Sequence, residues 1–148
     1  MVVNMTEITP RLSKGGIQLR QQVDDSFPDR DRRSDGWIGD TSHAQRPSDH
    51  NPVAITGWVR AIDIDRNLNN NASTSIYLAD QLRLYAKQHG RITYVIHVGK
   101  IASSKKNWAW RPYDGINAHE HHIHVSFDPS TDQNWSFFDI PMLGGKIA

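Results

Sequence analysis

Residues 122 to 127 read His-Ile-His-Val-Ser-Phe, and polar and apolar side chains alternate along this stretch. A period of two is typical of a β-strand with one buried face. The stretch sorts into an apolar set that faces the core and a polar set that faces away: Ile123, Val125 and Phe127, against His122, His124 and Ser126. It therefore predicts a sheet that presents two imidazoles in one row on the face opposite the core.

Histidines continue upstream of this strand, because residues 119 to 124 read His-Glu-His-His-Ile-His. This segment holds four of the eight histidines of the chain. Two imidazoles on one strand face lean into the same cleft, which is a good geometry for binding a metal ion. The chain has no cysteine, so disulfides, thiolate ligands and a cysteine nucleophile are excluded. A metal site here needs a third ligand from His, Asp or Glu.

A second strand is predicted over residues 58 to 64, Trp-Val-Arg-Ala-Ile-Asp-Ile. Asp63 lies there between two isoleucines, and a carboxylate in such surroundings is costly to bury unless it is paired or bound to a cation. An ion pair with a nearby arginine is the alternative to a metal, and Asp65 on the same face is a competing ligand. In the preceding loop, His50 is either a ligand or a residue that caps a turn.

The remaining pattern predicts an α+β fold. Helical spacing of apolar residues predicts helices over residues 11–24 and about 75–89, the second one capped by Thr74 or Ser75. A β-branched run at 92–98 is expected to turn back as a hairpin. We expect a small, mostly antiparallel sheet of about four strands with the helices packed on one side.

A length of 148 residues is typical of one domain, so we expect a single domain over residues 1–148. Its core should span about residues 11–127, and the tail, residues 128–148, should pack back on the domain. The aromatic residues of this tail are expected to make that contact: Trp135, Phe137 and Phe138. Residues 29–57 show no sustained period and predict a long loop region, and such loops are usually functional or disordered.

The net charge of +1 and the charged content of 22% are ordinary for a globular protein. Nucleic-acid partners are not expected, since proteins that bind them are more often strongly basic. No segment approaches the ~18 consecutive apolar residues of a membrane span, so membrane insertion is not expected. The first residues lack the apolar run of a secretory signal. We expect a monomer that is made in the cytoplasm and stays there unless another protein releases it.

Three motifs in this order resemble the zinc peptidases of family M15: Ser48-x-His50, Ala61-x-Asp63-Ile64 and His119-x-x-His122-x-His124. The family includes D-alanyl-D-alanine carboxypeptidases and the L-alanyl-D-glutamate peptidases of phage endolysins. It shares a fold core with the hedgehog signalling domain. The likeness is to the endolysin-type members in particular, and it covers roughly residues 17 to 127.

Carried over residue by residue, the resemblance implies that His50, Asp63 and His124 bind Zn²⁺. It implies a peptidase that hydrolyses an amide bond in the stem or cross-link peptides of bacterial peptidoglycan through a metal-activated water. The resemblance leaves three bonds open as the one that is cut: L-Ala-D-Glu, D-Ala-D-Ala and cross-link bonds. A phage endolysin is synthesised in the host cytoplasm and acts on the cell wall after release.

Two departures from the family pattern concern the site. Twelve residues separate His50 from Asp63, more than in many members, and a longer loop closes at small entropic cost. Many carboxypeptidase members have an acidic base three residues before the last metal histidine, where this chain has His121. The murein endopeptidase branch has His-x-x-His-x-His instead. The candidates for the base therefore rank in this order: His122, Glu120, then His119 and His121.

Two residues are candidates for substrate binding. Ser48 is expected either to hydrogen-bond substrate or to cap a turn. Arg33 resembles a family arginine that holds a substrate carbonyl or carboxylate, but Arg30 and Arg32 lie in the same cluster, and the alternative for all three is a solvated loop. The aromatic residues Trp108, Trp110 and Tyr113 should either wall the cleft or pack in the core.

Two other functions compete with the peptidase. A zinc-bearing but non-catalytic cell-wall-binding module of the hedgehog-like kind would keep the metal and lose the base. An HNH-like nuclease is suggested by clustered histidines with Asn107, Asn117 and Asp128, although that motif expects a helix after the strand pair.

Overall fold

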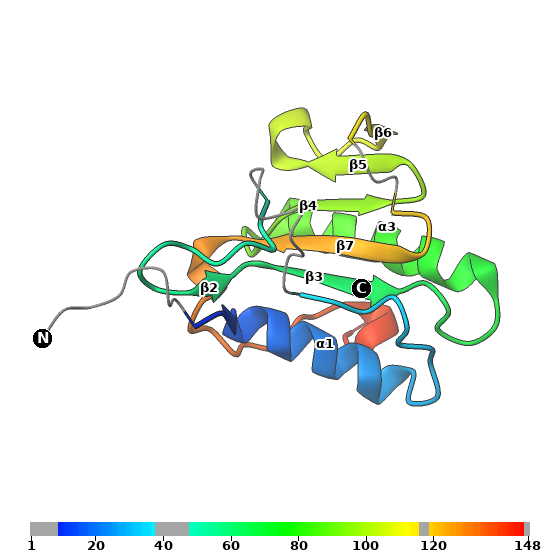
Figure 1. Cartoon of the computed structure of the whole chain (residues 1–148). Coiled ribbons are helices and arrows are strands. Elements are labelled where there is room, and N and C mark those ends of the chain that lie inside the picture. Colours follow the sequence, from blue (N-terminus) through cyan, green and yellow to red (C-terminus); the bar gives the residue numbers. More distant parts are fainter. Residues whose placement is uncertain (1–8, 38–47, 116–118, 147–148) are drawn as a thin grey trace, which may run out of the picture.

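The alternating stretch forms β7 (His122–Phe127), an interior strand of the main sheet (Figure 1). The computed structural model describes residues 9–37, 48–115 and 119–146. Within these residues the sheet has five antiparallel strands in the order β3–β7–β4–β5–β6. The other strands are β3 (Ala61–Asp65), β4 (Ile92–His97), β5 (Lys100–Ser103) and β6 (Arg111–Pro112). The mostly antiparallel sheet is confirmed, with one strand more than expected.

The remaining described elements lie outside this sheet. A short parallel pair joins β1 (Arg11–Leu12) to β2 (Trp58–Val59). The α-helices in the described residues are α1 (Lys14–Ser26) and α3 (Ala72–Gln88). Three single turns of 3₁₀ helix are η1 (Ser104–Lys106), η2 (Pro129–Thr131) and η3 (Pro141–Leu143). The expected α+β class is therefore confirmed.

The pairing of β3 with β7 sets the two faces of the sheet. Ile62 lies opposite Val125, and Asp63 lies opposite His124. Because side chains alternate along both strands, the apolar pairs share one face and the Asp63–His124 pair lies on the other. The division into a core face and an imidazole face, predicted from the sequence, is confirmed.

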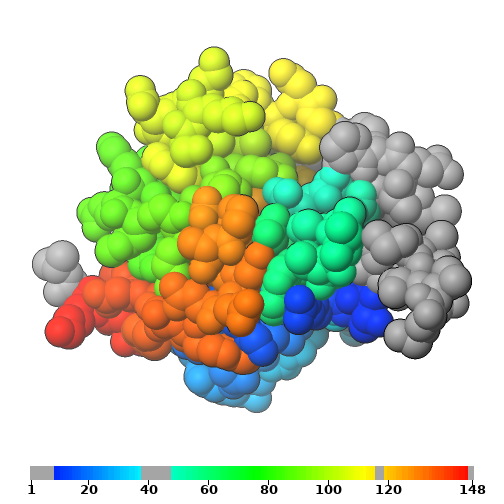
Figure 2. Space-filling model, turned by 90° about the vertical axis from the view of Figure 1, so that its left-hand side faces the viewer, coloured from blue at the N-terminus to red at the C-terminus, as the bar shows by residue number. Residues whose placement is uncertain are grey.

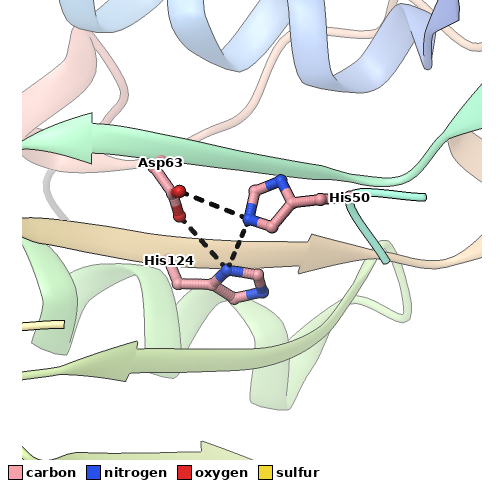
Figure 3. Close-up of side chains that lie close together, drawn as sticks. All are labelled: His50, Asp63 and His124. Carbon is pink, nitrogen blue, oxygen red and sulfur yellow. Dashed lines mark hydrogen bonds and ion pairs between the residues drawn. The ribbon is translucent and has the colours of Figure 1, made fainter. Parts of the chain in front are cut away.

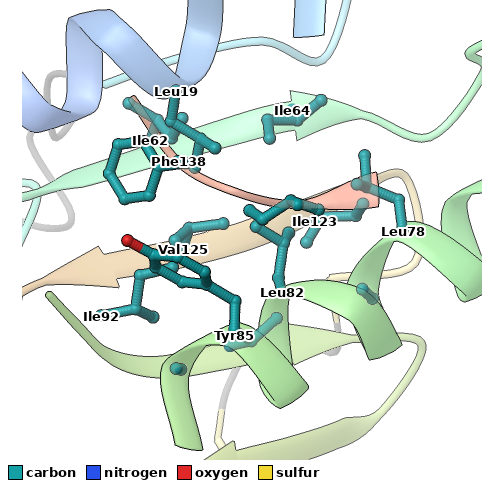
Figure 4. Close-up of a cluster of buried hydrophobic side chains, with 14 of the residues drawn as sticks. Leu19, Ile62, Ile64, Leu78, Leu82, Tyr85, Ile92, Ile123, Val125 and Phe138 are labelled. Carbon is teal, nitrogen blue, oxygen red and sulfur yellow. The ribbon is translucent and has the colours of Figure 1, made fainter. Parts of the chain in front are cut away.

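Both helices pack on the apolar face (Figure 4). Leu19 of α1, with Leu78 and Leu82 of α3, is buried in one cluster with strand residues that include Ile62 and Ile123. Burying each such side chain contributes roughly 1.5–3 kcal/mol. The packing of the helices on one side of the sheet, as predicted, leaves the opposite face for the histidines.

The helix boundaries differ from those predicted. Residues 11 and 12, expected to be helical, are extended and pair with β2, and Ser13 caps α1 by accepting a hydrogen bond from the Gly16 N–H. The second helix begins at Ala72, because Asn71 Oδ1 accepts the Ser73 N–H at 2.9 Å. The expected caps, Thr74 and Ser75, lie inside the first turn and are wrong.

The C-terminal segment completes the core with only part of its aromatic residues. Phe138 is fully buried, together with Ile140 and Leu143, whereas Trp135 and Phe137 are each 51% exposed. Of the three, only Phe138 therefore joins the core as predicted, whereas Trp135 contacts the domain at its surface, with Nζ of Lys14 4.8 Å from the centroid of its ring. Figure 2 shows the orange and red C-terminal residues between those of α1 and α3, consistent with the contacts of η3 with both helices.

The strand predicted over residues 58–64 is interrupted at Arg60. The N–H of Arg60 donates to the carbonyl of Asp49, and its guanidinium pairs with Asp132 at 2.6 Å. Residues 38–47 of the expected loop region lie outside the described residues, as does Asn117. Neither helix of the described part combines the length and the hydropathy that a membrane span requires.

Candidate metal centre

The candidate ligands come from three separate parts of the chain. Asp63 is the central residue of β3, and His124 lies directly opposite it on β7. His50 lies in the turn that follows Ser48, whose hydroxyl accepts the His50 N–H at 3.2 Å. The imidazoles of His50 and His124 are buried, and the Asp63 side chain is 18% exposed. The sheet therefore supplies two ligands in fixed register, and a capped turn brings the third.

The three side chains form a close triangle (Figure 3). Nε2 of His50 lies 3.1 Å from Nδ1 of His124 and 3.3 Å from Oδ2 of Asp63, and Nδ1 of His124 lies 3.2 Å from Oδ1 of Asp63. Zinc binds nitrogen and oxygen at about 2.0–2.1 Å, which puts the corners of a tetrahedron about 3.3–3.4 Å apart. Calcium, at about 2.3–2.6 Å, needs wider spacing. This His/Asp group could hold a small metal ion.

Each imidazole of the triangle has a hydrogen-bond partner at the ring nitrogen that faces away from the other ligands. Nδ1 of His50 lies 3.0 Å from the carbonyl oxygen of Trp37, so this nitrogen donates and Nε2 faces the triangle. Nε2 of His124 lies 2.7 Å from Oγ of Ser126, and the Tyr94 ring stacks on His124 with centroids 5.3 Å apart. Such outer partners are typical of metal-binding histidines, because they fix the ring and its tautomer.

The electrostatics favour a cation between these side chains. Burial alone would raise the pKa of the Asp63 carboxyl, but hydrogen bonds and charges from His124 and His50 hold this pKa well below its usual range. Burial also acts to lower the pKa of His50, yet the hydrogen bond and charge of Asp63 outweigh it and raise that pKa. Burial lowers the pKa of His124. Asp63 is therefore an anion that attracts positive charge into the triangle.

A second group that could hold a metal ion shares Asp63 with the first and adds His119 and His122. Nε2 of His122 lies 3.4 Å from Oδ1 of Asp63 but only 2.6 Å from Nδ1 of His119. The second distance is shorter than the ~3.3 Å edge of a zinc tetrahedron. A single carboxylate also offsets little of the charge of two divalent ions. Both arguments favour one ion, in the first triangle.

The pair formed by His119 and His122 is suited to carrying protons. Burial lowers the pKa of both imidazoles, that of His119 to about 3, with the neighbouring histidines adding to the effect. Both rings are therefore neutral near pH 7, and a neutral imidazole can accept a proton. Tyr113 approaches this pair, with its ring centroid 5.8 Å from that of His119.

Asp65, the competing ligand, is engaged elsewhere. Its two carboxylate oxygens accept the N–H groups of Ser34 at 2.9 Å and Asn67 at 2.8 Å. Although Asp65 shares the face of Asp63, its side chain therefore ties the loop before β2 to the end of β3. The structure brings Asp63, and not Asp65, to the two imidazoles.

The other candidates lie in different surroundings. The Ser48 hydroxyl caps the turn that carries His50, which was one of its two expected roles. The Arg33 side chain is 92% exposed, and the carboxylate of Asp31 lies 3.9 Å from its Nε. Glu120 and His121 are exposed, and their carbonyl oxygens accept hydrogen bonds from Arg66. Of the proposed bases, only His119 and His122 join the cluster around Asp63.

Two of the aromatic residues near the last motif pack in or against the core. Trp108 is buried in the hydrophobic cluster, and Trp110 packs against it while its indole N–H donates to Asp80 at 2.9 Å. Tyr113 alone among the three aromatics contacts the histidines. The packing alternative therefore describes the two tryptophans.

His97 is a site residue that the sequence argument missed. It is the last residue of β4, and its buried ring contacts the carbonyl oxygens of His119 and His122. The signal in the sequence is weak, since a histidine that ends the apolar run at 92–97 reads as an ordinary core residue.

No protein-family model, curated protein or solved structure matches the chain. Inference about its function therefore depends on the geometry of the site and on the motifs that carry it.

Proposed function

We propose that this protein is a zinc-dependent peptidase of the endolysin type that hydrolyses an amide bond in bacterial peptidoglycan peptides. His50, Asp63 and His124 would hold the ion, in a fold of the hedgehog and D-Ala-D-Ala peptidase kind. The observation that carries the proposal is the triangle of these side chains, with edges of 3.1–3.3 Å. Two neutral imidazoles and one carboxylate are a ligand set of catalytic zinc sites.

A zinc ion bound there would supply a Lewis acid that polarises the scissile carbonyl and makes a nucleophilic water available near neutral pH. The chain's own residues supply the proton transfers. His122, with Nε2 3.4 Å from Asp63 Oδ1, is the imidazole of the second pair nearest the triangle, and burial keeps it neutral. His122 would accept the proton from water and return one to the leaving amine, and because its Nε2 is hydrogen-bonded to Nδ1 of His119, the proton would enter a pair of imidazoles that share one hydrogen bond.

His119 supports this role through its contact with His122. With Nδ1 and Nε2 only 2.6 Å apart, one nitrogen of the pair must carry the proton and the other must accept it. The pair can therefore pass a proton along a preformed hydrogen bond without moving either ring.

The substrate half of the proposal is supported by the motif order, Ser48-x-His50, then Ala61-x-Asp63, then His119-x-x-His122-x-His124. A surface hollow whose lining includes none of the three ligands has polar groups that would suit a carboxylate. Arg32, about half exposed, and Arg33, largely exposed, line it with Asn69 and Asn70. An arginine fork can hold a carboxylate through two hydrogen bonds.

The test is digestion of purified peptidoglycan by the zinc-loaded protein, with and without a chelator, with fragments identified by mass spectrometry. We expect new peptide ends whose release stops with chelation and resumes when zinc is restored. Cleavage that survives chelation would refute the metal mechanism. Zinc binding and tight attachment to peptidoglycan with no released peptide would support the non-catalytic binding module instead.

The nuclease alternative finds less support in the geometry. An HNH-like site needs a metal-binding helix after its strand pair, but β7 is followed by the single 3₁₀ turn η2 that begins at Pro129. Cleavage of DNA without cleavage of peptidoglycan would support the nuclease function instead of the peptidase function.

A further inference from the structure

His97 connects helix α3 to the segment that carries the two proton-transfer imidazoles. Its Nε2 lies 3.0 Å from Oγ of Ser75, in the first turn of α3. Its Nδ1 lies 3.1 Å from the carbonyl oxygen of His119 and 2.9 Å from that of His122. The His97 ring is 2% exposed, so water does not compete for these contacts. One side chain thus spans the two ends of the turn from His119 to His122.

The partners of His97 fix its tautomer. Carbonyl oxygens only accept hydrogen bonds, so Nδ1 must carry the proton that both carbonyls share. Nε2 is then the acceptor and receives the hydroxyl proton of Ser75. Burial lowers the pKa of His97, in keeping with a neutral ring. The ring therefore acts as a rigid donor toward the turn and takes no charge.

The turn needs such support because its backbone is unfavourable. His119 has φ of +55°, in the left-handed region that costs a residue with a Cβ of order 1 kcal/mol or more. Its carbonyl oxygen receives two donors, Nδ1 of His97 and the N–H of Val98 at 3.2 Å. These contacts hold the conformation that brings His119 Nδ1 against His122 Nε2.

We propose that His97 is a positioning residue, which clamps the turn from His119 to His122 and so sets the two imidazoles beside Asp63 for proton transfer. This inference rests on the peptidase function proposed above. Ser75 orients the His97 ring from α3, so the helix contributes to the site without contacting substrate. Misplacing a catalytic group by about 1 Å can cost on the order of 100-fold in rate.

Two substitutions divide the functions of the ring. In His97→Asn the side-chain amide nitrogen takes the place of Nδ1 and can still donate to both carbonyls. In His97→Gln the amide reaches the place of Nε2, near Ser75, and both carbonyls lose the hydrogen bond that Nδ1 of His97 donates. Both variants lose the ring, so a general loss of packing would affect them alike. His89→Gln, at the exposed end of α3, controls for the loss of a histidine.

The measurements are made on the zinc-loaded full chain. Peptide release should fall about tenfold to a hundredfold in His97→Gln, mainly in kcat. It should be largely retained in His97→Asn, with zinc content unchanged in both. Equal loss in the Asn and Gln variants at equal thermal stability would overturn the proposal, and so would full activity of His97→Gln.

A second measurement does not depend on catalysis. Imidazole ¹H–¹⁵N correlation spectra should show shifted resonances of His119 and His122 in His97→Gln, smaller shifts in His97→Asn, and none in His89→Gln. If the wild-type protein releases no peptide but these shifts appear, the peptidase function fails and the clamp stands. Unshifted His119 and His122 resonances in His97→Gln would refute the clamp whatever the activity.

Discussion

Nε2 of His124 lies 2.7 Å from the hydroxyl oxygen of Ser126, two residues further along β7 on the same face. This contact leaves Nδ1 as the nitrogen that faces Asp63 and His50. β7 therefore supplies both a candidate ligand, His124, and the hydroxyl of Ser126 that orients its ring.

Ser126→Ala should weaken zinc binding by about 10- to 100-fold, because the His124 ring loses the partner that fixes its tautomer. Ser126 is fully buried and alanine is smaller, so the fold should persist. Competition with a fluorescent chelator measures the affinity. Ser130→Ala, at an exposed serine of η2, is the control. Unchanged affinity in Ser126→Ala would show that the hydroxyl does not act on the ligand.

The zinc content should be one ion per chain. His50→Ala, Asp63→Asn and His124→Ala should each lose the ion, whereas His119→Ala should keep it, as measured by elemental analysis after dialysis. Zinc at about 100 times its Kd adds roughly 2.7 kcal/mol to the free energy of unfolding. Chelation should therefore lower the Tm by on the order of 5 °C or more. Two ions per chain would contradict the preference for the first triangle.

His122→Ala should lower peptide release by about 10²- to 10⁴-fold, the usual contribution of a general base, while zinc remains bound. Glu120→Gln and His121→Ala change neighbouring residues whose side chains are exposed, and both should retain activity. Equal loss in Glu120→Gln would move the base to the carboxylate, as the sequence alternative allowed.

Arg30 and Arg33 should separate stability from substrate binding. The Arg30 guanidinium is buried between Asp24 and Asp35, and Asp35 also accepts the Asp65 N–H at 2.7 Å. Arg30→Ala should cost about 1–3 kcal/mol in the free energy of unfolding, because it removes the buried cation that two partly buried carboxylates share.

Arg33→Ala is the matched comparison for Arg30→Ala, and it should change stability by less than about 0.5 kcal/mol because its side chain is 92% exposed. Urea denaturation measures both. If Arg33 binds substrate, its variant should raise KM. An unchanged KM would remove Arg33 from the substrate site.

Leu82→Ala should cost about 2–5 kcal/mol in the free energy of unfolding, since Leu82 is fully buried between α3 and the sheet. Leu84, two residues along the same helix, is 45% exposed, and Leu84→Ala should cost about 0.5 kcal/mol or less. Chemical denaturation compares the two. Similar losses would mean that α3 does not pack as described.

The sequence predicted the features that depend on alternation. The apolar and polar sets of residues 122–127 occupy opposite faces, and the same parity places Asp63 opposite His124. Local spacing was enough here, because a strand with one buried face has a single acceptable register. Parity could not choose between Asp63 and Asp65. That choice needs the position of the loop at residues 34–36, which binds the Asp65 side chain and backbone.

Long-range contacts account for what the sequence did not predict. The function of His97 depends on Ser75 and on two carbonyl oxygens more than twenty residues later, and no local pattern encodes this. The start of α3 at Ala72 rather than near Ser75 reflects a competition between neighbouring polar caps, which Asn71 wins. Exposed Trp135 and Phe137 show that aromatic content alone does not predict burial.

The loop at residues 34–36 has a further effect on how other chains can approach. Gly36 and Asp63 exchange backbone hydrogen bonds of 2.7 and 3.2 Å, and the Asp65 N–H is taken by the Asp35 carboxylate. The outer side of β3 therefore has no row of free donors with which an extended peptide could pair. An extended peptide therefore cannot bind there as an added strand, and under the proposed function the substrate would have to reach the histidines across the face of the sheet. The loop at residues 34–36 also prevents this edge of β3 from pairing with the edge of a sheet in another molecule.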